Sequence, residues 1–161
     1  MTYRLIVIGS GPAGVSAATS YLKAGGEGPV LLVSRDADAP YERPPLSKDA
    51  LREPGEVEGS PIASAQELAG IEVRLGTPVT GIDLDERMVQ MGESAEAYEH
   101  LIIAAGMQPV PVPNADAEAD IHLLRSLGDA AALKQAAMHA RTALVIGSGF
   151  IGCEAAVSLA R

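Results

Sequence analysis

The stretch Leu5-Ile-Val-Ile-Gly-Ser-Gly-Pro-Ala-Gly14 decides the fold of this chain. Its continuous apolar run is typical of a strand buried on both faces of a parallel sheet, and the alanine- and serine-rich segment after it predicts a helix packed on that sheet. Between them, Gly9 allows a tight strand-to-helix turn, Gly11 lets the main chain approach a diphosphate, and Gly14 lets helix and sheet pack closely. The pattern predicts a dinucleotide-binding unit.

The same pattern returns as Leu144-Val-Ile-Gly-Ser-Gly-Phe-Ile-Gly152 and continues into Cys153-Glu-Ala-Ala156. A diphosphate binds at a helix N-terminus because unpaired N–H groups and the helix dipole favour an anion there. One such motif is a weak signal, whereas two copies in the same context are a strong one. The residues predicted to bind the two cofactors are Gly9, Ser10, Gly11, Pro12, Ala13 and Gly14 in the first copy, and Gly147, Gly149, Phe150, Ile151 and Gly152 in the second.

A second buried strand, Val30–Val33, ends where a dinucleotide-binding unit normally places an acid for the ribose hydroxyls of the adenosine. The sequence continues Ser34-Arg35-Asp36, with arginine at the position first expected for the acid. Either Asp36 binds the ribose or Arg35 contacts the adenosine in a different way. An arginine here also fits a 2′-phosphate, which would indicate NADP at the first site.

Composition limits the classes of function. The 161 residues are 47% apolar, and 21 acidic against 12 basic side chains give a net charge of −9 that is spread along the chain. A nucleic-acid partner is not expected at this charge. The single cysteine excludes an intramolecular disulfide, and the three histidines lack the spacing of metal ligands, so we predict no metal site. Neither a signal peptide nor a membrane span is recognisable, and we expect a cytoplasmic protein with no membrane partner.

The segment Tyr41-Glu-Arg-Pro-Pro-Leu-Ser-Lys48, at its distance after the first glycine motif, resembles the signature of the ferredoxin-reductase-like flavoproteins. That group includes the reductases of bacterial oxygenase and cytochrome P450 systems and, more distantly, apoptosis-inducing factor. The resemblance continues through the hairpin region from Gly70 to Met91, the segment Leu101-Ile-Ile-Ala-Ala-Gly106, the segment Leu124-Arg-Ser-Leu-Gly-Asp-Ala130 and the second glycine motif. It implies FAD at the first motif and NADH or NADPH at the second.

The resemblance also implies contacts to FAD from outside the glycine motif. Arg43 would reach the flavin side of the cofactor, and Val79 and Arg125 would contact it from later segments. Ala105-Gly106 matches a small-residue turn close to FAD that is usually Ala-Thr-Gly, so a threonine hydroxyl is missing here.

Lys48 and Glu154 are the candidate catalytic residues. In relatives, the lysine matching Lys48 reaches the flavin side and pairs with the glutamate matching Glu154. Such a pair is physically sensible beside a flavin, because a lone buried charge would be costly to desolvate. Nicotinamide would deliver a hydride to the flavin, and FAD would pass electrons singly to a ferredoxin or similar acceptor. The implied function is an FAD-dependent NAD(P)H oxidoreductase.

Two other functions stay open at this point. A disulfide or peroxide reductase needs a reactive thiol after the first unit, where this chain has Pro44-Pro45-Leu46-Ser47. Cys153 lies instead at the start of the second motif's helix, where a reactive thiol and small apolar filler between helix and sheet are the two interpretations, of which the filler is the simpler. A non-catalytic dinucleotide-binding module is the third possibility.

The predicted fold class is α/β, with a Rossmann-like FAD-binding three-layer domain that carries a β-meander insertion, followed by the truncated start of a second Rossmann NAD(P)-binding domain. We place the first segment of the FAD-binding domain at 1–108, a linker at 109–121 and the second domain at 122–161. An incomplete second domain would leave the isolated chain inactive. The further elements predicted are strands at 71–75, 79–84, 87–91 and 144–146 and helices at 65–69 and about 127–139.

Overall fold

The computed structural model describes residues 1–116 and 119–160 of the chain. These residues form two compact units. The first unit comprises Met1–Glu42 and Gly59–Gly106, and the second comprises Arg43–Glu58 and the described residues from Met107 onward.

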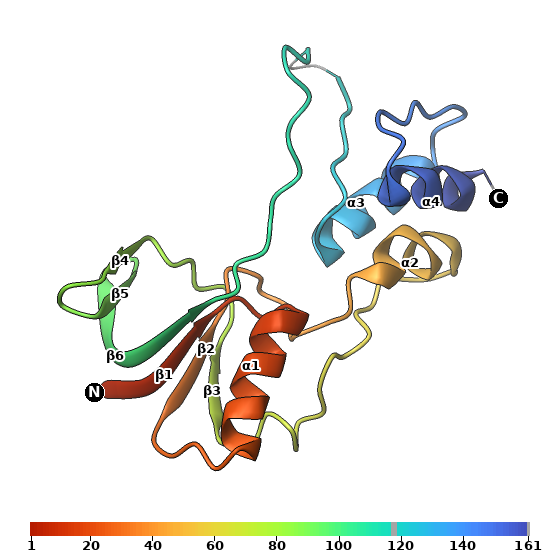
Figure 1. Ribbon diagram of the computed structural model, residues 1–161. Coiled ribbons are helices and arrows are strands. Elements are labelled where there is room, and N and C mark those ends of the chain that lie inside the picture. The colour runs from red at the N-terminus through yellow and green to blue at the C-terminus, as the bar shows by residue number, and fades with distance from the viewer. Residues whose placement is uncertain (117–118, 161) are drawn as a thin grey trace. The chain divides into compact units, whose positions relative to one another are not determined.

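The first unit is built on a six-stranded mixed sheet (Figure 1). Its strands lie in the order β3-β2-β1-β6-β5-β4. The first four in this order are parallel, and β5 and β4 continue the sheet as an antiparallel arm. In chain order the strands are β1 (Thr2–Ile8), β2 (Val30–Val33), β3 (Ile71–Arg74), β4 (Gly81–Asp83), β5 (Met88–Met91) and β6 (Ser94–Ile103).

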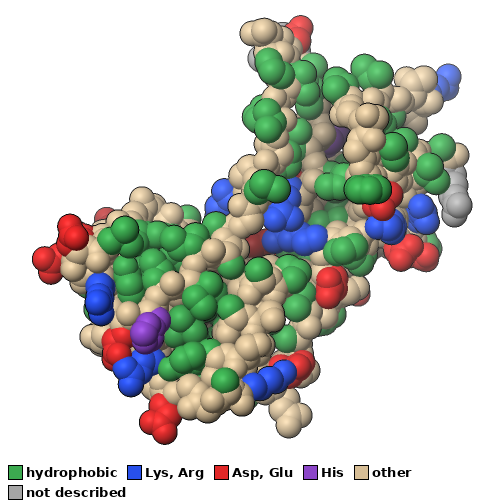
Figure 2. All heavy atoms as spheres, in the orientation of Figure 1, with side chains coloured by type: hydrophobic (Ala, Val, Ile, Leu, Met, Phe, Trp, Pro, Cys, Tyr) green, Lys and Arg blue, Asp and Glu red, His purple; other side chains and the backbone are tan. Residues whose placement is uncertain are grey.

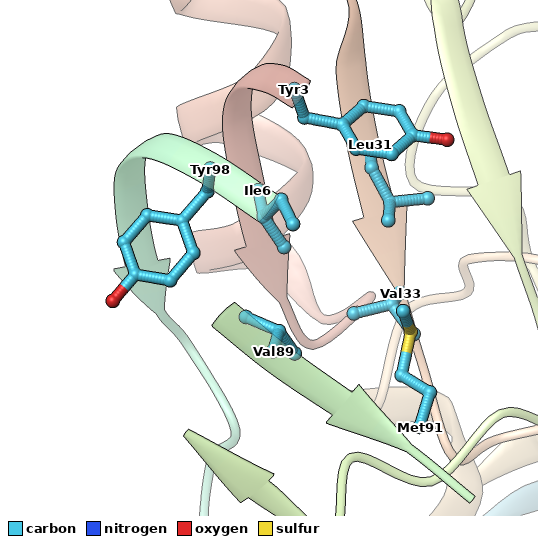
Figure 3. Packing of buried hydrophobic residues seen from close by; sticks show 7 residues of the cluster. All are labelled: Tyr3, Ile6, Leu31, Val33, Val89, Met91 and Tyr98. Carbon is cyan, nitrogen blue, oxygen red and sulfur yellow. The ribbon is translucent and has the colours of Figure 1, made fainter. Parts of the chain in front are cut away.

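Helix α1 (Pro12–Lys23) covers one face of the parallel strands. Its Val15 and Ala18 join a buried cluster with Leu5, Val7 and other strand residues. The opposite face of the parallel strands carries a second cluster, to which β5 of the antiparallel arm contributes Val89 and Met91. Figure 3 shows this second cluster, made of Tyr3, Ile6, Leu31, Val33, Val89, Met91 and Tyr98. Both faces of β1 and β2 are therefore dry, as their unbroken apolar runs predict.

The second unit is helical within its described residues. It contains the 3₁₀ turn η1 (Pro44–Ser47) and the helices α2 (Asp49–Arg52), α3 (Leu127–Ala137) and α4 (Phe150–Leu159). Helix α3 begins with a capping box, in which the Ser126 hydroxyl accepts the Asp129 N–H and the Asp129 carboxylate accepts the Ser126 N–H. This reciprocal pair satisfies two amides that would otherwise be unpaired at the helix start.

The predicted strand at 144–146 is wrong. The described residues of the second unit contain no strand, and Leu144 and Ile146 are 87% and 70% exposed. A β-strand exists by hydrogen bonding to a neighbouring strand, and no such neighbour is present among these residues. Figure 2 shows that hydrophobic side chains remain at the molecular surface.

The predicted helix at 65–69 is also wrong, because this segment forms turns. The Ser64 N–H and hydroxyl both donate to the Glu67 carboxylate, which closes a single turn. Gly70 then adopts a left-handed backbone with φ +87°, and β3 begins at the next residue. A capped start followed at once by a glycine stop leaves no room for a helix. The prediction at 79–84 was too long, since β4 is confined to Gly81–Asp83.

None of the helices in the described part of the chain is long and apolar enough to cross a membrane.

A polar network joins three strands of the first unit through Arg74 on β3. Its guanidinium donates to Glu72, to Glu96 on β6 and to the Tyr3 hydroxyl on β1, each at 2.7 Å. The Tyr3 hydroxyl in turn donates to Glu72 at 2.7 Å. Burial, followed by this hydrogen bond to Glu72, raises the pKa of Tyr3 to about 12.

This raised pKa predicts a loss of stability at high pH. The pKa of an unfolded tyrosine is about 10, so the neutral phenol of Tyr3 stabilises the fold fully below that pH and the contribution falls as the pH rises toward 12. Tyr3→Phe cannot ionise and should lose less unfolding free energy than the wild type over this range, by on the order of 2 kcal/mol. Urea unfolding at a series of pH values measures this. Equal pH dependence in the two proteins would contradict the assignment.

Candidate functional site

The first glycine motif forms a loop closed by backbone contacts on two sides. Gly9 has φ +111° and donates its N–H to Val33 O at 2.8 Å. A Cβ on Gly9 would lie 2.7 Å from the Ala104 carbonyl carbon and closer still to its oxygen. A Cβ on Gly14 would lie 3.0 Å from the Gly9 carbonyl carbon and again closer to the oxygen. These two glycines let β1, β6 and α1 meet without a side chain between them.

Gly11 has free space around its Cβ position, in contrast to Gly9 and Gly14. A Cβ at this position would meet nothing within 4 Å. Gly11 is the N-cap of α1, and Pro12 begins the helix. Gly11 has no side chain to cap the helix start, so no side-chain hydrogen bond satisfies the first amides of α1 there. The loop therefore fits a diphosphate, which needs close main-chain approach and free N–H groups.

The predicted turn Ala105-Gly106 follows β6 at the same edge of the sheet. The register pairs Ile8 with Ile103, and Ala104 N–H donates to Ile8 O at 2.8 Å. The structure thus brings Ala105 and Gly106 next to the end of β1, from which the glycine loop begins. This is the carboxyl edge of the parallel strands, where open α/β sheets bind ligands.

The loop after β2 places Arg35 and Asp36 differently. Arg35 is exposed, whereas Asp36 is half-buried and engaged within its own loop. One oxygen of the Asp36 carboxylate accepts the Tyr41 hydroxyl at 2.8 Å, and the other accepts the Asp38 N–H at 3.3 Å. Asp36 therefore shapes the loop, and its contact with a ribose stays a prediction.

Val79 is partly buried and packs against the cluster shown in Figure 3. Its predicted contact with FAD stays a prediction.

In the second unit the structure brings Lys48 and Glu154 together. Lys48 Nζ lies 2.8 Å from Glu154 Oε2, and the buried Ser47 donates its hydroxyl to the same oxygen at 2.6 Å. Lys48 also donates to Pro44 O at 3.1 Å. The hydrogen bonds from Lys48 and then Ser47 lower the pKa of Glu154. The residues form an ion pair, and their catalytic role stays a prediction.

Arg43 and Arg125 also meet in the second unit. Arg43 Nη1 donates to Arg125 O at 2.8 Å, and Arg125 Nε donates to Met107 O at 2.8 Å. The Arg125 N–H donates to the Asp129 carboxylate at 3.0 Å, which ties Arg125 to the capped start of α3. Their contact with a flavin stays a prediction.

The second glycine motif repeats the loop of the first. Gly147 has φ +114°, a Cβ on Gly152 would lie 2.5 Å from Gly147 O, and Gly149 is open within 4 Å. Phe150 and Ile151 begin α4 and are 89% and 55% exposed. Unlike Gly9, Gly147 has no neighbouring backbone within 4 Å of its Cβ position. The motif forms its own turn, but the strand context of the first copy is missing among the described residues.

Sequence reasoning missed three contributors to the first site: Ser34, Tyr41 and Ala104. Ser34 contacts Ser10 through their hydroxyls, Tyr41 donates to Asp36, and Ala104 supplies the backbone against which Gly9 packs. No spacing in the sequence signals the contact of Ser34 with Ser10. It follows from the parallel register that pairs Ile8 with Val33, since residues that follow paired strands lie side by side.

These features define a dinucleotide-binding fold, and comparison with known proteins identifies its family. A family model described as pyridine nucleotide-disulphide oxidoreductase matches residues 3–161, and the chain belongs to this family. It is 37% identical to rhodocoxin reductase of Rhodococcus erythropolis over 159 residues, covering 96% of this chain and 37% of that protein. It is 32% identical to the ferredoxin–NAD(+) reductase component of the p-cumate 2,3-dioxygenase system of Pseudomonas putida, covering 96% and 39%.

Among solved structures, the covalent putidaredoxin reductase–putidaredoxin complex matches with a TM-score of 0.85 at 30% identity, covering 98% of this chain and 40% of that one. The predicted family resemblance and Rossmann-like fold class are confirmed. The chain spans about 40% of the length of these relatives.

Proposed function

We propose that this chain binds FAD at its first glycine motif and is the FAD-binding portion of an enzyme that moves electrons from NAD(P)H to a ferredoxin-type acceptor. The observation that carries the proposal is the first loop, closed at Gly9 and Gly14 and open at Gly11. Bound FAD would supply the chemistry, since it accepts a hydride and releases electrons singly. The printed names of the relatives, which include ferredoxin–NAD(+) and rubredoxin–NAD(+) reductases, support the same assignment.

Different residues of this chain would bind different parts of the cofactor. The main chain from Gly9 to Gly14 would hold the diphosphate, and Ala105 and Gly106 would lie against the cofactor from the adjacent strand end. Arg35 and Asp36 are the candidates for the adenosine end. Because Asp36 is already engaged by Tyr41, the exposed Arg35 is the more available of the two.

Lys48 and Glu154 would supply a paired charge near the reacting part of the cofactor, with Arg43, Val79 and Arg125 as further FAD contacts. A pair of opposite charges avoids the desolvation cost that either charge would carry alone. The second motif, Gly147 to Gly152, would take NAD or NADP. The names of the relatives favour NAD.

A cysteine relay is not supported. Residues 43–48 contain no cysteine, and the lone Cys153 donates its thiol to Ser148 O at 3.5 Å within its own turn. The electrons would therefore leave FAD directly for the acceptor.

The test is a preparation of the protein made from its complete gene. We expect it to carry FAD, to oxidise NADH or NADPH, and to reduce a ferredoxin or rubredoxin in proportion. A purified protein that takes up no FAD when titrated with it would overturn the proposal. Full activity after alkylation of thiols would count against a disulfide-type reaction.

The chain of residues 1–161 alone is expected to show no NAD(P)H-dependent dye reduction. The apolar run before the second motif is exposed and unpaired, so the described residues do not build the sheet that a nicotinamide site requires. Steady-state dye reduction by purified chain, compared with the complete gene product at equal FAD, measures this. Comparable turnover in the two preparations would show that the expectation is wrong.

A further inference from the structure

Ser34 stands at the carboxyl end of β2 with its backbone fixed on both sides. Its N–H donates to Arg74 O at 2.9 Å, and its carbonyl accepts the Thr77 N–H at 2.7 Å. The residue is 6% exposed. Its hydroxyl is therefore held at one place beside the glycine loop.

The Ser34 hydroxyl connects the two halves of the first site. It lies 2.8 Å from the hydroxyl of Ser10, which is itself 5% exposed and stands between Gly9 and Gly11. It also accepts the Asp36 N–H at 3.1 Å. A serine hydroxyl has one proton and two lone pairs. With one lone pair taken by the Asp36 amide, Ser34 still has a proton to donate.

In this structure Ser10 donates to Ser34. A hydroxyl proton rotates to suit its surroundings, so the direction reverses when an acceptor lies beyond Ser10. Ser34 would then donate to Ser10, and Ser10 would donate to the anion at the open side of Gly11. The chain of donors runs from the Asp36 amide through Ser34 and Ser10, and each bond polarises the next.

We propose that Ser34 is a positioning residue for FAD. Its hydroxyl would link the loop after β2, which contains Asp36, to the diphosphate by a hydrogen bond through Ser10. This inference rests on the proposed binding of FAD at the first motif. Ser34 does not touch the cofactor itself. By donating to the Ser10 hydroxyl, it directs the proton of Ser10 toward the diphosphate. It also joins the diphosphate loop to the loop that Asp36 and Tyr41 shape.

The test measures FAD dissociation constants for the protein made from its complete gene. We expect Ser34→Ala and Ser10→Ala each to weaken FAD binding by roughly 10- to 150-fold, the worth of one hydrogen bond to a charged group. The FAD dissociation constant of the double variant should exceed that of the weaker-binding single variant by no more than about twofold, because either substitution alone already removes the linked pair of hydrogen bonds. Ser20→Ala, the same change at an exposed position of α1, should bind FAD like the wild type.

An affinity of Ser34→Ala equal to the wild type, or fully multiplicative losses in the double variant, would overturn this link. If Ser34→Ala lowers the melting temperature of the apo-protein, Ser34→Cys keeps the side-chain size with only a weak donor and must still weaken FAD binding. A wild-type protein that binds no FAD would defeat the proposed function itself. Wild-type binding with an unaffected Ser34→Ala would defeat only this inference.

Discussion

Replacing Gly14 with alanine should destabilise the first unit by about 3 kcal/mol, which is large for the addition of one methyl group. The new Cβ would lie 3.0 Å from the Gly9 carbonyl carbon and closer to its oxygen, and 3.4 Å from Val7 Cγ1. The obstacle is backbone at a tight turn, so no side chain can rotate away. Relief requires α1 to move off the sheet, which would open the packing of Val15 and Ala18.

Gly11→Ala is the matched control for this effect. It makes the same chemical change in the same loop, where the Cβ meets nothing within 4 Å and φ is −75°. Its free energy of unfolding should stay within about 0.5 kcal/mol of the wild type or rise slightly, because alanine restricts the unfolded chain. Urea unfolding of both variants, followed by circular dichroism, makes the comparison. Equal stability of the two variants would show that Gly14 is not needed for packing.

The first site was largely predictable because its parts are close in sequence or follow adjacent strands. Gly9, Gly11 and Gly14 lie within one strand-to-helix turn, so their spacing alone predicts the role of each. Ala105 and Gly106 are distant in sequence, and only the family resemblance pointed to them; the structure places them next to the end of β1. The Ser34 hydroxyl was not predictable, because its partner Ser10 is defined only by the register of β1 and β2.

The wrong prediction of a strand at 144–146 has a physical origin. The run Leu144-Val-Ile146 has the composition of a buried strand. Composition indicates only a preference for strand, and the strand forms only when a neighbouring strand supplies hydrogen bonds. The glycine turn after it needs no partner, and it forms as predicted with Gly152 against Gly147. A local turn can therefore be predicted from sequence more reliably than the strand beside it.

Gly11→Val is expected to weaken FAD binding by at least about 100-fold while leaving the protein folded. A Cβ at Gly11 meets no atom within 4 Å, and the extended backbone of this residue, φ −75° and ψ −179°, suits a β-branched side chain. The same side chain would then occupy the space through which the main chain reaches the diphosphate. Loss of about two charge-assisted hydrogen bonds, each worth roughly 1.5–3 kcal/mol, gives this factor.

Gly149→Val provides the matched control for this prediction, since it makes the same change at the corresponding position of the second motif. Gly149 is also open within 4 Å and has nearly the same backbone, φ −74° and ψ 173°. In the protein made from its complete gene, Gly149→Val should keep wild-type FAD affinity and lose affinity for the nicotinamide cofactor. FAD titration and the KM for NADH or NADPH separate the two variants. If Gly149→Val instead lost FAD and Gly11→Val kept it, the cofactors would have to be exchanged between the motifs, because the two substitutions differ only in the loop that they obstruct.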